Sequence, residues 1–408
     1  MSDEKKLIPS FYSGFLKLFS GLAVVQLLNL GFSLILPRYY SPVDYAFFGV
    51  FTAIIFILIE IVTLKLDVTI FFQKNDEEAL EIVHAIFFIC FCFTLIVLVL
   101  SVCLSLFYDS KYILLSLSLL VYGMVLPLSA WFNRQKDYRR LNTYRIIQAL
   151  MIPVLSLLFI IVFKWHFGLV LGFILGQMAG LLYLLFSFHH FSFDLIRYNL
   201  VSKYLHKYKH FPKYGVVSSL IGSISRNSIV LFVKYFFGST NAGYYTMSTR
   251  ILNAPTGMYQ SALSQVFLQQ ASHLENAALK VYIKKVIWFG FFLGILPVVL
   301  LLFFGQEIFG FLFGAEWLMA GKMSQYIVLW FFSITLVAPV GLMLDIKQKL
   351  RFEAGWNSLL LILRMTAIFA GVLLNDLFLM LLILCVVGVA MNLYLLYYVL
   401  KLINDKAD

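Results

Sequence analysis

Long apolar runs separated by short polar stretches restrict the fold of this sequence more than any other feature. A helix of about 20 apolar residues crosses the hydrocarbon core of a bilayer. The runs are about twice as long as a membrane-barrel strand and do not alternate in polarity. They predict an all-α polytopic membrane protein with about 12 transmembrane helices. The predicted spans are 12–36, 45–64, 82–106, 112–132, 143–164, 167–188, 214–237, 243–268, 283–304, 323–344, 356–374 and 377–401.

The composition agrees with this class. Hydrophobic residues make up 62% of the chain and charged residues only 12%, which is too little polar surface to cover a soluble fold. The four cysteines lie inside apolar runs without metal-ligating neighbours, so we interpret them as small hydrophobic residues of the interior. The sequence therefore predicts neither a cofactor nor a metal site.

The net charge of +11 is explained by topology. If the N-terminus is cytoplasmic, 22 of the 31 lysines and arginines fall on the cytoplasmic side and only five on the other side. In membrane proteins, the cytoplasmic loops carry an excess of lysine and arginine. We therefore expect both termini in the cytoplasm, and nucleic acid is not needed as a partner to explain the basic excess.

An internal repeat divides the chain into two halves. Residues 39–48 and 236–245 are 197 residues apart, and each segment joins an aromatic pair, a small polar turn and a second aromatic pair that opens a helix. We expect a six-helix bundle over 1–188, an amphipathic cytoplasmic linker over 189–213 and a second six-helix bundle over 214–408. Because six is even, a pseudo-twofold axis along the membrane normal would relate the bundles.

Two segments carry a resemblance to a known family. The segment LILPRYYSPVDYAFFGVF (34–51), followed by LKLDVTIF (64–71), resembles the opening of bacterial polysaccharide and O-antigen flippases. Residues 211–267 are similar to the seventh and eighth spans of the same family, which belongs to the multidrug/oligosaccharidyl-lipid/polysaccharide exporter superfamily.

The resemblance implies a function in lipid transport. It implies that an undecaprenyl-pyrophosphate-linked oligosaccharide crosses the bacterial inner membrane by alternating access. The expected partners are this substrate, membrane lipids and a coupling ion (H⁺ or Na⁺), together with a polysaccharide polymerase and chain-length proteins.

Cations inside the predicted spans are the main candidates for a binding site. A charge at the bilayer centre costs about 2.5–3.5 kcal/mol on insertion scales, so Arg226, Arg250 and Arg364 need a reason to be there. Arginine binds phosphate oxygens through two parallel hydrogen bonds. We therefore predict that these arginines line a cationic cavity for an anionic substrate, with Asn253 on the helical face of Arg250.

Weaker candidates lie in the first span. Lys17 is close enough to the cytoplasmic end to extend its ammonium group to the interface, or it could join the cavity. Gln26 and Asn29 share a helical face, which suits either a polar wall for sugar hydroxyls or hydrogen bonds between helices.

Two acidic residues, Glu60 and Asp67, are candidates for ion coupling or charge pairing. The repeat offset places both on the face of the second span that corresponds to the arginine face of the eighth. Glu60 could neutralise Arg226 or Arg250, or it could take up a proton during transport. Asp67 lies near Lys65, where a simple ion pair at the membrane interface is the plainer interpretation.

Other functional classes fit the sequence less well. It has neither a phosphate-binding glycine loop nor a nucleophile elbow, and we expect a transporter and not an enzyme. One alternative, a cation-coupled multidrug exporter of the same superfamily, would need an anionic cavity. A membrane polysaccharide polymerase, the second alternative, would be expected to carry a large outer loop, which this sequence lacks.

Overall fold

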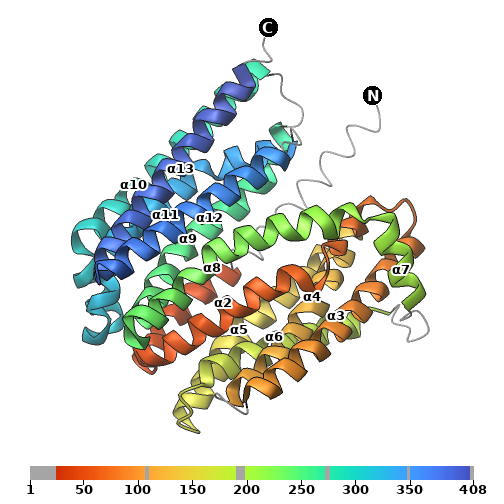
Figure 1. Cartoon of the computed structure of the whole chain (residues 1–408), viewed down its shortest axis with the longest axis horizontal. Coiled ribbons are helices and arrows are strands. Elements are labelled where there is room, and N and C mark those ends of the chain that lie inside the picture. Colours follow the sequence, from red (N-terminus) through yellow and green to blue (C-terminus); the bar gives the residue numbers. More distant parts are fainter. Residues whose placement is uncertain (1–23, 106–109, 190–197, 272–275, 347–349, 405–408) are drawn as a thin grey trace. The chain divides into compact units, whose positions relative to one another are not determined.

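The computed structural model describes residues 24–105, 110–189, 198–271, 276–346 and 350–404. Helices joined by short turns account for the fold of this described part (Figure 1). An apolar helix from Val24 to Arg38 comes first. The remaining elements are η1 (Leu36–Arg38), α2 (Pro42–Val62), η2 (Leu66–Phe72), α3 (Asp76–Ser105), η3 (Ser110–Ile113), α4 (Leu114–Arg134), α5 (Tyr138–Ile161), α6 (Gly168–Ser187), α7 (Tyr198–Lys207), η5 (Phe211–Gly215), α8 (Val216–Phe237), α9 (Ser239–Ala271), α10 (Asn276–Phe313), η6 (Ala315–Trp317), α11 (Leu318–Ile346), α12 (Leu350–Leu373) and α13 (Leu377–Asn404).

Ten helices of the described chain are long and apolar enough to cross a membrane, which makes this a multi-pass membrane protein. They correspond to ten of the twelve predicted spans. The other two predicted spans fall on the helix that begins the described residues and on α9. Helix α9 is long but carries polar residues on successive turns, which lower its hydropathy.

Contacts group the chain into two units. The first comprises residues 1–32 and 50–223, and the second comprises residues 33–49 and 224–408. The sequence led us to expect a division at 188 and 214. Instead, residues 33–49 pack with the second unit, whereas α7 and the first turns of α8 pack with the first unit. We call residues 33–49 the corner.

The start of α2 is fixed by its own sequence. The backbone N–H and the hydroxyl of Ser41 both donate to Asp44 Oδ2, at 2.9 and 2.8 Å, and the Asp44 N–H donates back to Ser41 Oγ. This is a capping box, and Pro42 occupies the first helical position, where its missing N–H costs nothing. The polar turn of the repeated segment therefore begins the helix at Pro42, three residues before the predicted span.

The two units repeat one packing pattern. Helices α2 and α9 begin at Pro42 and Ser239, which are 197 residues apart, the offset found in the sequence. In the first unit α3 packs on α4, α5 on α6 and α4 on α6. In the second unit α10 packs on α11, α12 on α13 and α11 on α13, in the same order along the chain.

Glycines allow α5 and α6 to approach closely. Gly172, Gly176 and Gly180 recur every fourth residue along one face of α6. A Cβ atom built at Gly176 would lie 2.7 Å from the backbone nitrogen of Ile152, and one at Gly172 would lie 2.7 Å from that of Ser156. Small residues at such spacing let membrane helices pack backbone against backbone.

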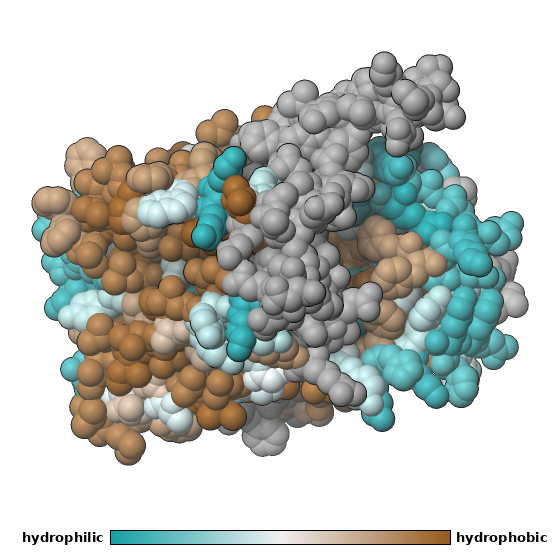
Figure 2. Space-filling model, turned by 90° about the horizontal axis from the view of Figure 1, so that it is seen from above, coloured by the Kyte–Doolittle hydropathy of each residue, from teal (hydrophilic) through white to brown (hydrophobic). Residues whose placement is uncertain are grey.

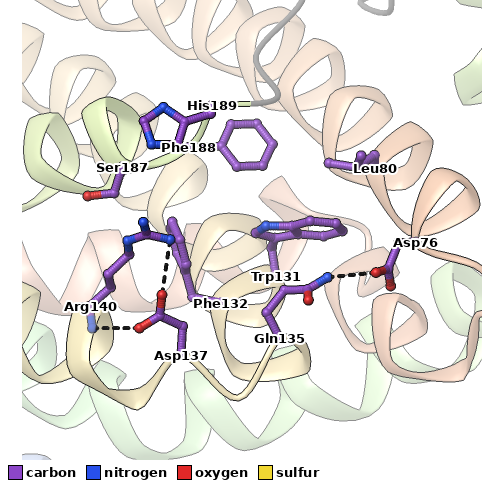
Figure 3. A pocket seen from close by; sticks show the side chains of 10 residues that line it. All are labelled: Asp76, Leu80, Trp131, Phe132, Gln135, Asp137, Arg140, Ser187, Phe188 and His189. Carbon is purple, nitrogen blue, oxygen red and sulfur yellow. Dashed lines mark hydrogen bonds and ion pairs between the residues drawn. The ribbon is translucent and has the colours of Figure 1, made fainter.

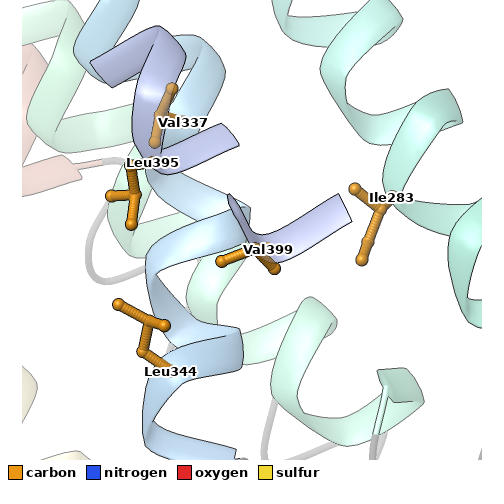
Figure 4. Close-up of a cluster of buried hydrophobic side chains, with 5 residues drawn as sticks. All are labelled: Ile283, Val337, Leu344, Leu395 and Val399. Carbon is orange, nitrogen blue, oxygen red and sulfur yellow. The ribbon is translucent and has the colours of Figure 1, made fainter. Parts of the chain in front are cut away.

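The core of the second unit is apolar. Ile283 from α10, Val337 and Leu344 from α11, and Leu395 and Val399 from α13 form one buried cluster (Figure 4). The cluster joins three of the helices that repeat the pattern of the first unit. Because its side chains are closely packed, this bundle can hold polar groups elsewhere in the unit in fixed positions.

Helix α7 is held on α3 by polar contacts within the first unit. Lys203 and the Tyr204 hydroxyl both reach Glu81 Oε2 at 2.6 Å, and Lys207 lies 3.2 Å from Glu78. Figure 2 shows both hydrophilic and hydrophobic residues on the face that it presents. Within the predicted linker, α7 is thus a helix docked on α3.

Candidate functional site

The three predicted intramembrane arginines all belong to the second unit. Arg226 is on α8, Arg250 on α9 and Arg364 on α12. Their surroundings differ strongly: Arg226 is exposed, Arg250 is half-buried and Arg364 is only 4% exposed. One pattern in the sequence therefore corresponds to three distinct environments.

Arg364 is enclosed by the helices of its own unit. Its Nη1 donates to Ser225 Oγ at 2.9 Å, and its guanidinium carbon lies 4.8 Å from the centroid of the Trp330 ring. Its Nε is buried and has no hydrogen-bond partner in the described part of the chain. Arg226, one residue beyond Ser225 on α8, interacts with Arg364 electrostatically. Two positive charges therefore lie close together in this bundle.

Arg250 rests on an aromatic ring of α2. Its guanidinium carbon lies 5.5 Å from the centroid of the Phe48 ring. A cation over an aromatic face is attracted by the ring quadrupole. The Nη1 of Arg250 is buried and, within the described residues, has no hydrogen-bond partner. The side chain is thus held in place while part of its donor capacity is unused.

Arg250 and Arg364 have no carboxylate partner in the part of the chain that the structure describes. Among the described residues, the ion pairs within 4.0 Å involve other cations, and neither Arg250 nor Arg364 takes part in one. The two guanidinium groups therefore keep their positive charge and contact aromatic rings and a hydroxyl group. Such an arrangement retains the attraction for an incoming anion.

Neighbouring positions on the arginine face of α9 are open. Asn253 is exposed, Gln260 is half-buried, and a Cβ atom built at Gly257 would have nothing within 4 Å. These residues follow Arg250 at helical spacing, as the sequence predicts. The face can therefore offer amide groups and free space beside the cation.

Glu60 pairs with a lysine of its own unit. Its carboxylate lies 2.7 Å from the ammonium group of Lys65 in the first unit, and a pairing of Glu60 with Arg226 or Arg250 stays a prediction. Lys65 has a φ of 58°, in the left-handed turn that follows α2. This turn reverses the chain and directs the lysine back to Glu60.

Asp67 accepts a hydrogen bond from Thr63 Oγ1 at 2.7 Å. Within the described residues Lys65 pairs with Glu60, and no ion pair within 4.0 Å joins it to Asp67. The other weak candidates lie near the beginning of the described chain, where Gln26 is half-buried and Asn29 is exposed. Lys17 lies outside the described residues.

Sequence reasoning missed Phe48, Trp330 and Ser225, the side chains that hold the arginines. Phe48 is part of the repeated aromatic segment, which was a signal that could have been followed. Trp330 and Ser225 carry no such signal, because their role depends on contacts of α11 and α8 with α12. Helical periodicity within one span does not report contacts between helices.

A polar pocket of about 420 Å³ lies in the first unit (Figure 3). Its charged groups already have partners: Arg140 lies 3.0 Å from Asp137, and Gln135 donates to Asp76 at 3.0 Å. The rings of Trp131 and Phe188 meet edge to face beside them. This paired set leaves less net charge for an anionic ligand than the arginines of the second unit do. Within the described residues, histidines, cysteines and carboxylates form no group of three that could hold a metal ion.

The fold is similar to those of solved transporters. A multidrug resistance transporter of the MATE family and the MOP superfamily, in an inward-facing conformation, is 13% identical, with a TM-score of 0.70 over 94% of this chain and 98% of that one. The lipid II flippase MurJ, in an inward closed conformation, is 17% identical, with a TM-score of 0.72 over 94% of this chain and 87% of that one. The chain thus has a fold like those of MATE transporters and MurJ.

Sequence comparison identifies the family. The capsular polysaccharide biosynthesis protein CapF of Staphylococcus aureus is 26% identical over 34% of this chain, a match that spans 42% of the length of that relative. The family model described as "Polysaccharide biosynthesis protein" matches residues 35–322, most of the chain. This range contains most of the corner and every helix from α2 to α9. The chain therefore belongs to the polysaccharide biosynthesis protein family.

Proposed function

We propose that this protein is a flippase for an undecaprenyl-pyrophosphate-linked oligosaccharide, the repeat unit of O-antigen or of another surface polysaccharide. The repeat unit crosses the bacterial inner membrane by alternating access, driven by an ion gradient. Membership in a polysaccharide biosynthesis family and a transporter fold support this proposal.

The observation that carries the proposal is the environment of Arg250. A half-buried guanidinium whose Nη1 has no described partner, with no carboxylate paired to it among the described residues, suits an anionic group. The pyrophosphate is the anionic part of the proposed substrate, and arginine can bind its oxygens through two parallel hydrogen bonds. The polyprenyl tail, being apolar, remains in the lipid.

The other residues have supporting roles. Arg226 is exposed and can contact the headgroup directly, and Asn253 can donate to sugar hydroxyls from the same face as Arg250. Arg364 is buried, so it acts through the positive potential that it shares with Arg226. Lys17, Gln26 and Asn29 are proposed as additional polar contacts of the headgroup.

Charge separates this function from export of cationic drugs, although the two share a fold. A cationic drug would be repelled by Arg250 and Arg364, whose charges no described carboxylate balances. The described residues of the site therefore favour an anionic substrate.

Glu60 is the proposed coupling group. Its carboxylate is 20% exposed and pairs with Lys65, and protonation would remove the negative charge that holds this pair. An inward proton gradient could then drive transport. Asp67 lies close to this pair in the chain and supports the same turn through Thr63.

The proposed setting is the inner membrane, with both termini in the cytoplasm. A polysaccharide polymerase and chain-length proteins would act on the transported repeat unit on the outer side. The protein itself forms and breaks no covalent bond in this scheme.

Transport in proteoliposomes tests the proposal. A fluorescent lipid-linked oligosaccharide is reconstituted with the wild type, Arg226→Ala or Arg250→Ala, and the flipped fraction is measured by an added quencher. We expect both variants to flip more slowly, whereas Arg140→Ala, which removes a cation of the first unit, behaves as the wild type. Normal flipping by both arginine variants at unchanged expression contradicts the cationic site.

A further inference from the structure

Phe48, the ring under Arg250, comes from the corner and not from the sequence half that contains Arg250. The corner ends at Gly49 and packs within the second unit. Phe48 can therefore lie over Arg250 only while the corner is docked on α9. The contacts that dock the corner also decide the environment of Arg250.

Two glycines make this docking close. A Cβ atom built at Gly243 of α9 would collide with the backbone of Pro42, lying 3.0 Å from its Cα. A Cβ atom built at Gly49 would lie 3.0 Å from the Cβ of Thr246. Helices that approach this closely slide past one another only after they separate. In this structure the corner is therefore docked on α9 in close contact.

Trp317, in the turn between α10 and α11, closes over both repeated segments. Its ring meets Tyr45 of α2 edge to face at 5.0 Å and Tyr244 of α9 at 6.2 Å. Its Nε1 donates to the carbonyl of Pro37 at 2.9 Å, and the side chain is 1% exposed. One indole thus joins the corner to α9, and undocking would leave its N–H without this acceptor.

The choice of an aromatic ring under Arg250 has a chemical consequence. A carboxylate in that position would orient the guanidinium but cancel its charge. The Phe48 ring restricts the guanidinium from one side, leaves its net charge uncancelled and takes up none of the N–H groups of Nη1, which have no partner among the described residues. The ring therefore preorganises the arginine for an anion.

We propose that Phe48 is a positioning residue for Arg250, and that docking of the corner through Trp317 gives Arg250 its high affinity for a phosphate-bearing headgroup. When the corner undocks, Arg250 loses its aromatic support and the headgroup is released. The proposal rests on the function given above. It adds a means by which the affinity for the headgroup changes between conformations, because the contacts that dock the corner also position Arg250.

The test measures binding of inorganic pyrophosphate to the full chain in nanodiscs, by calorimetry at fixed salt. Phe48→Leu removes the aromatic face and is expected to weaken binding by about ten-fold, which corresponds to about 1.4 kcal/mol. Phe48→Tyr keeps an aromatic face and is expected to bind pyrophosphate as the wild type does. Phe311→Leu, an exposed phenylalanine, is the matched control.

Trp317 supplies a second, independent arm. Trp317→Leu leaves Arg250 and Phe48 intact but removes the docking contacts, and it is expected to weaken pyrophosphate binding to a similar extent. In the double variant with Phe48→Leu, Trp317→Leu should weaken pyrophosphate binding little further, because both residues act through the docked corner. Fully additive losses would contradict a shared mechanism and overturn the proposal.

A crosslink provides a readout that a folding defect cannot imitate. Gly49→Cys with Thr246→Cys, in a chain whose four native cysteines are replaced by alanine, brings two Cβ atoms near disulfide distance. The oxidised form should bind pyrophosphate at least as tightly as the reduced form and should not transport. Weaker binding in the oxidised form overturns the proposal.

Pyrophosphate binding distinguishes the anionic site at Arg250 from the positioning role of Phe48 and Trp317. If Arg250→Ala abolishes pyrophosphate binding but Phe48→Leu and Trp317→Leu bind as the wild type does, the positioning role is overturned and the anionic site stands. If Arg250→Ala itself binds normally, the anionic site and the inference built on it both fall. Melting temperatures of all variants identify those that fold.

Discussion

Replacing Arg364 by methionine should stabilise the second unit while reducing anion attraction. The guanidinium is 4% exposed and lacks a carboxylate among its described neighbours. Methionine has a similar length, is unbranched and carries no charge, so it can fill the same space. The substitution therefore removes the cost of a buried charge without creating a large cavity.

The magnitude follows from the contacts of Arg364. Burying the ion costs about 5 kcal/mol. Against this, the hydrogen bond to Ser225 contributes about 2 kcal/mol and the Trp330 ring about 2 kcal/mol. The balance favours methionine by about 1 kcal/mol, which corresponds to an increase in melting temperature of about 2–4 °C for a unit of this size.

The assay is thermal unfolding of the purified protein, monitored by a thiol-reactive dye that reports exposure of the buried Cys90 and Cys385. Ser225→Ala should have the opposite sign, because it leaves Nη1 without its acceptor and costs about 1–3 kcal/mol. Arg140→Met, which breaks an exposed ion pair, should change little. Pyrophosphate affinity of Arg364→Met should fall less than that of Arg250→Ala.

A fall in melting temperature for Arg364→Met would refute this reasoning. It would mean that the guanidinium stabilises the bundle in net terms, and that hydroxyl and ring together outweigh its desolvation. Arg364 would then be primarily a structural residue.

Three further predictions concern residues of the first unit, and the first of them includes a control substitution in the second unit. Gly176→Leu should lower the melting temperature through a clash of about 1–3 kcal/mol with the backbone of α5, whereas Gly355→Ala, with nothing within 4 Å, should not. The hydrogen bond to Glu78 raises the pKa of Lys207, so the Lys207–Glu78 pair is fully formed below the usual pKa range of lysine and is lost only as the pH rises through the raised pKa. Trypsin cleavage after Lys207, divided at each pH by the cleavage rate of the same segment as a free peptide, should therefore be constant from about pH 6 to 9. A Glu60→Gln variant should flip at a rate independent of an imposed pH gradient, and a retained dependence would exclude Glu60 as the coupling group.

Much of the helical plan could be predicted because a membrane imposes it. The runs of apolar residues identify ten spans, and the Ser41–Asp44 capping box explains why α2 begins three residues early. Helix α9 shows the limit of hydropathy, because its polar face belongs to the candidate site. Its helical period and its place in the repeat nevertheless predicted the helix.

The candidate site could be predicted only in part. The three arginines follow from the cost of a charge in a membrane, and the structure places all of them in one unit. Their exposure could not be predicted, because it depends on which helices surround them. The Glu60–Lys65 pair escaped prediction because a left-handed turn, invisible to helical periodicity, redirects Lys65.

The exchange of segments between the two units has a consequence for fragments of this chain. The first sequence half lends the corner to the second unit, and the second half lends the start of α8 to the first unit, where Ser223 Oγ donates to the Phe56 carbonyl at 2.6 Å. This resembles a domain swap within one chain. Two fragments separated after Phe188 would each lack a piece of their own fold, so they should be unstable when expressed alone and should copurify when expressed together.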